Sequence, residues 1–228
     1  MEVKTLVTIA GARLYVIASP SRAGDDLEEG VRKAISGGAD VVQLRDKFSS
    51  ASQVLETART LGRICRQSGV IFIVNDRVDI ALASGADGVH LGQDDLPVSE
   101  ARNLAKRHGR SEPFLIGCST HSLEQALLAQ DEGADYIGCG PVFSTPTKPD
   151  YRVQGLELVR QYREQIRIPF VAIGGIDEGN IAQVAQAGAR CAAVVRAVLG
   201  SADPEAAARS LKNAILTPTL SFDKERGS

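Results

Sequence analysis

Charged and amide side chains follow several short apolar runs of the chain, and their types suit binding of phosphate and of a hard metal ion. In Gln43-Leu44-Arg45-Asp46-Lys47, the donors Gln43, Arg45 and Lys47 alternate, so at strand spacing they point to one side. Lys148 adds a cation, and such groups hold phosphate oxygens. Asp76 and Asp95 are hard oxygen ligands, and Mg2+ often takes one or two carboxylates beside water and substrate phosphate. This set indicates a metal-bound polyphosphate, whereas zinc would favour clustered His or Cys ligands.

A second anion site is indicated near the end of the chain. Gly174-Gly175 follows an apolar run, and a helical segment comes after it. Glycine lets backbone N–H groups approach a phosphate, with the helix N-terminus behind them. A lone Gly-Gly is usually only a tight turn, but here it accompanies the first set of polar residues. The sequence therefore predicts two phosphorylated substrates, or one substrate with a phosphate at each end.

The elements that must position these groups are revealed by an internal repeat. Gly-Ala-Asp begins at Gly38, Gly85 and Gly133, Gly-Ala-Arg begins at Gly188, and the glycines are 47, 48 and 55 residues apart. Each glycine follows a helical pattern and precedes an apolar run, as suits the left-handed residue that ends a helix. A period near 48 residues fits two strand–helix units. The repeat thus predicts eight strands.

The eight apolar runs are almost continuous rather than alternating, as strands buried on both faces should be. They are 14–17, 41–44, 70–74, 88–91, 114–117, 136–139, 170–173 and 191–195. Helical patterns lie between them, for example over 51–67 and 122–132, with Ser122 as N-cap and Gln125 completing a capping box. These features predict an α/β protein with a single (β/α)8 TIM barrel. A doubly wound open sheet is the alternative, and the fourfold repeat argues against it.

In such a barrel the carboxyl ends of the strands form the working face. The polar segments after the second to the eighth strand all fall on that face, including Ser119 and the Val195-Arg196 pair. One charged residue at a strand end is usually a solvated surface group, but a whole set on one face is not expected by chance. His90 lies within a strand and is expected to have a hydrogen-bonded structural role. The role of His121 is left open.

Composition excludes several other classes of protein. The chain has 228 residues and a formal charge of −2, and only 4% of its residues are aromatic, so neither a basic coat for nucleic acid nor a base-stacking platform is expected. No apolar run reaches the ~18 residues of a membrane helix. The four cysteines include no Cys-x-x-Cys pair, and with the weak N-terminal apolar stretch they indicate a reduced, cytoplasmic protein.

We expect a barrel domain over 1–216 and a disordered tail over 217–228; a homo-oligomer is left open.

Together these motifs resemble the thiamine phosphate synthase (thiamine-phosphate pyrophosphorylase) family. They are Gln-Leu-Arg-Asp-Lys at 43–47, Asn-Asp-Arg at 75–77, His-Leu-Gly-Gln-Asp-Asp at 90–95, Thr-Pro-Thr-Lys at 145–148 and Gly-Gly-Ile at 174–176. The resemblance implies a transferase that joins 4-amino-2-methyl-5-(diphosphomethyl)pyrimidine to a thiazole ethyl phosphate and releases pyrophosphate. It implies that these two small molecules, not nucleic acid or a membrane, are the partners.

The resemblance also implies roles for individual residues. It places the pyrimidine diphosphate on Gln43, Arg45, Lys47, Asn75, Ser119 and Lys148, with Arg45, Lys47 and Lys148 acting on the leaving group. It places Mg2+ on Asp76 and Asp95, and the thiazole phosphate on Thr145, Pro146, Thr147, Gly175, Val195 and Arg196.

Two positions depart from the family pattern. Asp46 stands where Glu is usual, and Arg196 stands where Ser is common, which puts the thiazole phosphate contact in question. The alternatives are a related barrel that only isomerises the thiazole and a non-catalytic barrel that binds a phosphate ligand. Retention of Asp76, Asp95 and Lys148 argues against both.

Overall fold

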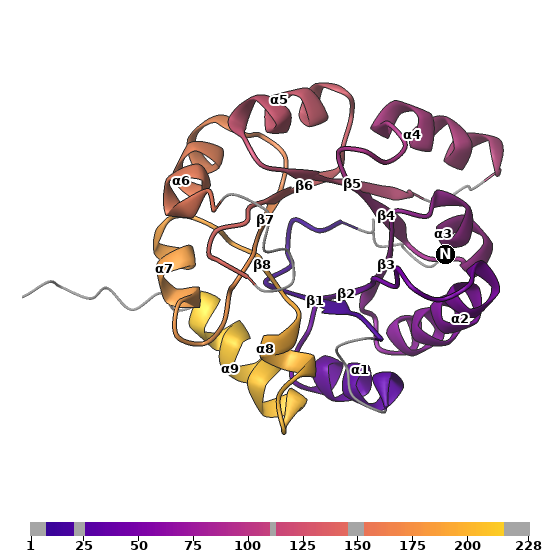
Figure 1. Ribbon diagram of the computed structural model, residues 1–228, viewed down its shortest axis with the longest axis horizontal. Helices are drawn as coiled ribbons and strands as arrows, with labels where there is room; N and C mark the ends of the chain where they lie inside the picture. The colour runs from indigo at the N-terminus through magenta and orange to yellow at the C-terminus, as the bar shows by residue number, and fades with distance from the viewer. Residues whose placement is uncertain (1–7, 21–25, 110–112, 146–152, 217–228) are drawn as a thin grey trace, which may run out of the picture.

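The computed structural model describes residues 8–20, 26–109, 113–145 and 153–216, which form a closed parallel barrel surrounded by helices (Figure 1). Each strand pairs with the next along the chain, and β1 closes the ring by pairing with β8 through Leu14 and Ala192. The strands are β1 (Leu14–Ala18), β2 (Val41–Leu44), β3 (Ile71–Asn75), β4 (Gly88–Leu91), β5 (Leu115–Thr120), β6 (Tyr136–Cys139), β7 (Phe170–Ile173) and β8 (Ala192–Val194). The predicted (β/α)8 barrel is confirmed.

The helices lie outside the barrel and cover it on all sides (Figure 1). They are α1 (Leu27–Ser36), α2 (Ala51–Gln67), α3 (Val78–Ser84), α4 (Val98–Arg107), α5 (Leu123–Asp131), α6 (Gly155–Gln165), α7 (Ile181–Gln186), α8 (Arg196–Leu199) and α9 (Pro204–Leu216). Within the ranges given above, no helix combines the length and apolarity that a membrane crossing requires. The tail predicted over 217–228 lies outside the described residues.

Helix α5 begins where the sequence predicts, but its start is built differently. The Ser122 side chain accepts a hydrogen bond from the Gln125 amide at 3.2 Å, as an N-cap should. The Gln125 side chain accepts from the amide of His121 at 2.7 Å, one residue before the position that a capping box requires. The predicted capping box is therefore wrong, and Gln125 instead holds the chain just after β5.

The glycine repeat performs the predicted turn. Gly38, Gly85, Gly133 and Gly188 all have φ between 73° and 113°, a backbone conformation that favours glycine. The aspartates that follow the first three glycines accept hydrogen bonds from backbone amides near the start of the preceding strand. The pairs are Asp40 with the Leu14 amide at 3.0 Å, Asp87 with Phe72 at 2.8 Å and Asp135 with Ile116 at 2.6 Å. The aspartates of the repeat thus hold the amino ends of β1, β3 and β5, at the end of the barrel opposite the carboxyl ends of the strands.

The interior of the barrel is packed with side chains rather than open. Tyr15 and Tyr136 from β1 and β6 are 2% and 0% exposed, and they pack with Ile73, Leu115 and Val171. A second and larger apolar layer fills the space between the strands and the helices. This floor closes the barrel below the carboxyl ends of the strands, so any ligand must bind above it.

Candidate active site

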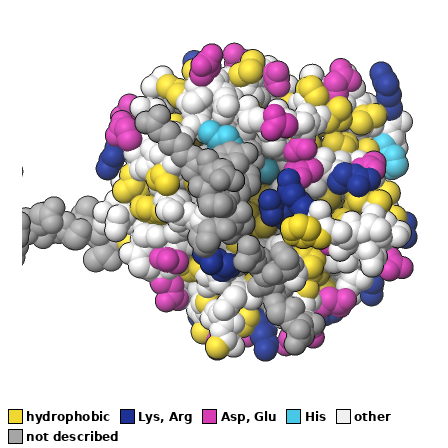
Figure 2. All heavy atoms as spheres, viewed as in Figure 1, with side chains coloured by type: hydrophobic (Ala, Val, Ile, Leu, Met, Phe, Trp, Pro, Cys, Tyr) yellow, Lys and Arg dark blue, Asp and Glu magenta, His cyan; other side chains and the backbone are white. Residues whose placement is uncertain are grey.

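A cavity of about 580 Å³ lies at the carboxyl ends of the strands. The face that holds it is the one seen in Figure 2, where Lys and Arg side chains gather beside Asp and Glu side chains near the middle. Nine of the residues predicted to contact substrate line this cavity. They are Gln43, Arg45, Lys47, Asn75, Ser119, Thr145, Gly175, Val195 and Arg196. The barrel therefore brings together residues far apart in the sequence: Gln43 and Arg196, which are 153 positions apart, line one cavity.

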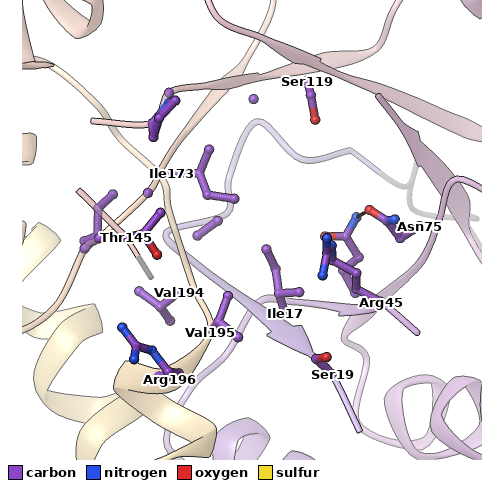
Figure 3. A pocket seen from close by; sticks show the side chains of 18 of the residues that line it. Ile17, Ser19, Arg45, Asn75, Ser119, Thr145, Ile173, Val194, Val195 and Arg196 are labelled. Carbon is purple, nitrogen blue, oxygen red and sulfur yellow. Dashed lines mark hydrogen bonds between the residues drawn. The ribbon is translucent and has the colours of Figure 1, made fainter. Parts of the chain in front are cut away.

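One side of the cavity is made by the ends of β2 and β3 (Figure 3). Gln43 is 2% exposed, and its Nε2 donates to Oδ1 of Asn75 at 3.2 Å. This bond orients the two amides side by side and leaves the Asn75 Nδ2 group to donate elsewhere. Arg45 and Lys47 follow on the same side, as the alternating pattern predicts. The result is a wall of donors and cations suited to an anionic ligand.

Asp76 and Asp95 lie behind this wall rather than on the cavity surface. Oδ2 of Asp76 is 3.1 Å from Nζ of Lys47, and the Asp76 side chain also meets that of Asp95 within hydrogen-bonding range. Burial, together with the neighbouring Asp95 carboxyl, raises the pKa of Asp76 despite the opposing effect of Lys47. Oδ2 of Asp95 accepts from the Gly92 amide at 2.7 Å. Two carboxyl groups thus lie together with one cation, Lys47, which pairs with Asp76.

This pair suits a hard divalent cation. Its donors are carboxylate oxygens, and a second positive charge would favour the ionised form of Asp76, which burial and the neighbouring Asp95 carboxyl disfavour. Across the part of the chain that the structure describes, no group of three or more His, Cys, Asp or Glu side chains is assembled. The protein would thus supply two ligands and leave the remaining positions for water or substrate oxygens, as is usual for Mg2+.

The opposite side of the cavity carries the predicted glycine turn. Gly174 and Gly175 have φ of 106° and 62°, and a Cβ on Gly175 would lie 2.4 Å from the Ser144 carbonyl oxygen. Only glycine fits this approach. The Gly175 carbonyl accepts from Nδ2 of Asn180 at 2.8 Å, while its amide has no acceptor among the described residues. A free amide at such a turn can donate to an anion.

Thr145 and Arg196 lie beside this turn, across the cavity from Arg45 and Asn75 (Figure 3). Arg196 is exposed and makes no ion pair with any described residue. Its charge is therefore available to a ligand at the glycine turn. Pro146, Thr147 and Lys148 lie outside the described residues, so their predicted roles stay predictions.

Asp46, which departs from the family pattern, serves the loop after β2. Its Oδ1 accepts from the amides of Phe48 at 3.0 Å and Ser49 at 3.1 Å. Burial alone would raise the pKa of Asp46, but the hydrogen bonds from Ser49 and Phe48 outweigh it and lower the pKa. Asp46 does not line the cavity, so the exchange of Glu for Asp falls on a loop contact.

The two histidines of the face have different partners. His90 makes hydrogen bonds from both ring nitrogens, to the Tyr136 hydroxyl at 3.2 Å and the Ser119 hydroxyl at 3.0 Å. It thus has the hydrogen-bonded role that its position in a strand predicts, and it also lines the cavity. Nδ1 of His121 contacts the Gly140 carbonyl, and this residue too lines the cavity.

Sequence reasoning missed Ser19 and Thr120. Both are buried, at 5% and 0% exposure, and both line the cavity. Ser19 directly follows β1, so the rule that polar residues follow each strand could have found it. Thr120 looks like the end of a loop in the sequence, but it is the last residue of β5 and bonds the Gly138 carbonyl at 2.8 Å.

Known proteins resemble this chain over most of its length. A family model described as thiamine monophosphate synthase matches residues 14–198. A thiamine-phosphate synthase from Chloroflexus aurantiacus is 48% identical over 211 residues, which are 91% of this chain and 94% of the relative. A thiamine-phosphate synthase from Thermosynechococcus vestitus is 47% identical over 203 residues, which are 89% of this chain. The chain spans 56% of that longer protein.

Solved structures agree with these relatives. A thiamine phosphate pyrophosphorylase from Pyrococcus furiosus superposes with a TM-score of 0.82 at 40% identity, covering 90% of this chain and 96% of that one. A 3-hexulose-6-phosphate synthase superposes with a TM-score of 0.63 at 21% identity, which shows the shared barrel alone. From the family match and the identities above, the chain belongs to the thiamine monophosphate synthase family.

Proposed function

We propose that the protein condenses 4-amino-2-methyl-5-(diphosphomethyl)pyrimidine with a thiazole ethyl phosphate, giving thiamine phosphate and pyrophosphate. One observation carries the proposal. A single cavity of about 580 Å³ has cations beside a carboxylate pair on one side and a glycine turn beside Arg196 on the other. That volume lies in the usual range for small-molecule sites. Two anionic ends of two substrates can thus be held apart while their reacting atoms meet between them.

The first half of the site would hold the pyrimidine diphosphate. The Gln43–Asn75 amide pair and the Ser119 hydroxyl offer hydrogen bonds, and Arg45 and Lys47 offer charge. Lys148 belongs to this group by the family resemblance. The bond between the methylene carbon and the diphosphate oxygen breaks, and its electron pair leaves with the diphosphate. Preorganised cations stabilise the charge that develops on that leaving group.

Asp76 and Asp95 would hold Mg2+, which when bound supplies Lewis-acid stabilisation of the diphosphate. Lys47 lies between this pair and the cavity, because its Nζ contacts Asp76 while the residue lines the cavity. Lys47 therefore links the carboxylate pair to the cation wall.

The second half of the site would hold the thiazole phosphate. Its contacts would come from cavity-lining residues, namely Thr145, Gly175, Val195 and Arg196. The family resemblance adds Pro146 and Thr147. The electron-rich aminopyrimidine supports the methylene cation, and the thiazole nitrogen supplies the electron pair of the new carbon–nitrogen bond. No strong general base is required for these steps. The free, buried cysteines fit a reaction in the reducing cytoplasm.

The deciding experiment mixes the purified protein with both substrates and Mg2+ and measures thiamine phosphate and pyrophosphate. We expect the two products in equal amounts, and neither product when one substrate is omitted. A change in the thiazole phosphate without the pyrimidine substrate would indicate an isomerase instead. Binding of either substrate without any product would indicate a non-catalytic barrel.

A further inference from the structure

A chain of four hydrogen-bonding groups runs from the floor of the barrel to the cavity. The Tyr15 hydroxyl is 3.1 Å from that of Tyr136, which is 3.2 Å from Nδ1 of His90. Nε2 of His90 is 3.0 Å from the Ser119 hydroxyl, and both His90 and Ser119 line the cavity. The two tyrosines lie on β1 and β6, so the chain crosses the interior of the barrel.

The barrel is built to admit this chain. The His90 and Tyr136 rings lie 5.4 Å apart between centroids, on either side of Gly117. A Cβ on Gly117 would lie 2.2 Å from the Tyr136 ring and 2.5 Å from Nδ1 of His90. Any other residue at 117 would push the two rings apart, and the bond between them would be lost.

The buried end of the chain sets the direction of every bond. Each tyrosine hydroxyl has one proton to donate. The Tyr15 hydroxyl has a single partner among the described residues, the Tyr136 oxygen. If Tyr136 donated to Tyr15, the Tyr15 proton would be buried without an acceptor, which is costly. Tyr15 therefore donates to Tyr136, and Tyr136 must give its own proton to Nδ1 of His90.

The same direction continues to the cavity. Because Nδ1 of His90 accepts, the neutral ring carries its proton on Nε2, which then donates to the Ser119 oxygen. The Ser119 hydroxyl proton is left free to point elsewhere. The Ser119 backbone is held as well, because its carbonyl accepts from Nε2 of Gln93 at 2.7 Å. Ser119 is thus fixed in place with one donor to offer.

We propose that Tyr136 and His90 are positioning residues: Tyr136 holds His90 in its Nε2–H tautomer, and His90 in that form makes Ser119 a hydrogen-bond donor to the pyrimidine diphosphate. The contact with that substrate rests on the proposed function, whereas the tautomer does not. The two parts can therefore be tested separately.

The first test reads the tautomer directly, by 15N NMR of the imidazole rings in the intact, ligand-free protein. The protein has three histidines, and the His90→Gln variant identifies the His90 signals by their loss. We expect an unprotonated Nδ1 and a protonated Nε2 at neutral pH. A proton on Nδ1, either in the other neutral tautomer or in the cation, would overturn the proposal even if the enzyme condenses its substrates as proposed.

The second test uses kinetics with Tyr→Phe variants. Tyr136→Phe removes the donor to Nδ1 and should lower kcat/KM for the pyrimidine diphosphate about tenfold, while KM for the thiazole phosphate stays unchanged. Tyr15→Phe leaves the Tyr136 proton with His90, so its effect should stay within about twofold. In a Ser119→Ala background, Tyr136→Phe should have no further effect.

Tyr162→Phe is the matched control for removal of a buried hydroxyl. Its hydroxyl bonds Thr120 at 2.7 Å and the Ser122 carbonyl at 2.9 Å, not His90. We expect it to lower Tm about as much as Tyr136→Phe does, without the selective fall in kcat/KM for the pyrimidine diphosphate. An equal effect of Tyr136→Phe with and without Ser119, or an equal loss from Tyr15→Phe, would contradict the proposed direction of the chain.

Discussion

Nζ of Lys47 lies 3.1 Å from Oδ2 of Asp76, so a cation of the cavity wall is tied to the carboxylate pair behind it. The link has two consequences. It orients Lys47 along the cavity, and it partly offsets the repulsion between Asp76 and Asp95. Removing either carboxylate should therefore disturb both the metal site and the cation wall.

We expect Asp76→Asn and Asp95→Asn each to lower kcat by about 10²–10³, the usual cost of a preorganised charge contact, and to raise the Mg2+ concentration needed for activity. Steady-state assays across a range of Mg2+ check this. Asp79→Asn is the matched control, because Asp79 pairs with Arg77 at 2.6 Å on the surface and should leave activity unchanged. Full activity of the unaltered protein in excess chelator would refute the metal site.

The raised pKa of Asp76 predicts a pH dependence of stability. The folded state favours the protonated carboxyl, so the contribution of Asp76 to the free energy of unfolding is fully present below its unfolded pKa. That contribution is lost as pH rises through the raised folded pKa. In chelator, the Tm of the Asp76→Asn variant should therefore increase relative to the Tm of the parent protein as the pH rises from about 4 to neutral.

Mg2+ should reverse this trend at neutral pH. A bound cation favours the ionised pair, so Tm of the parent should rise with Mg2+ and Tm of Asp76→Asn should not. If the difference in Tm between the two proteins in chelator were the same at every pH, the raised pKa of Asp76 in the folded protein would be contradicted.

Arg196 should add charge to the thiazole phosphate site. Arg196→Ser is expected to raise KM for the thiazole phosphate about tenfold or more and to weaken its dependence on salt, with little change in KM for the pyrimidine diphosphate. Arg190→Ser is the control, since Arg190 is exposed at the amino end of β8, away from the cavity. Unchanged affinity in Arg196→Ser would assign phosphate binding to backbone amides alone.

Lys148 lies outside the described residues, and its role is predicted from the sequence. Lys148→Ala should lower turnover by about 10² or more, with a smaller effect on thiazole phosphate binding. Single-turnover kinetics separate the two effects. A neutral result would remove Lys148 from the mechanism.

The barrel could be predicted because its cause is local. The Gly38, Gly85, Gly133 and Gly188 turns fall where a helix must end, and continuous apolar runs mark strands buried on both faces. The strand limits were less predictable. β5 runs on through Ser119 and Thr120 because they pair with Gly138 and Cys139 of β6, and a polar sequence does not reveal such pairing.

The site could be predicted as a set of residues but not as a geometry. Strand parity places Gln43, Arg45 and Lys47 on one surface. It does not say that Asp76 adopts a positive φ of 63° or that its side chain meets that of Asp95. Likewise, a lone His within a strand gives no sign that its Nδ1 lies 3.2 Å from the hydroxyl of Tyr136, which in turn contacts that of Tyr15.

The aspartates of the glycine repeat hold some strands of the barrel at their amino ends but not others. Asp40, Asp87 and Asp135 each accept a hydrogen bond from a backbone amide of the preceding strand. The fourth repeat carries Arg190 at this position, and an arginine side chain cannot accept a hydrogen bond. Residue 190 therefore cannot give β7 the carboxylate–amide hydrogen bond that β1, β3 and β5 have. The strand that leads directly into the Gly174-Gly175 turn is therefore the one whose repeat places an arginine, not a carboxylate, at this position.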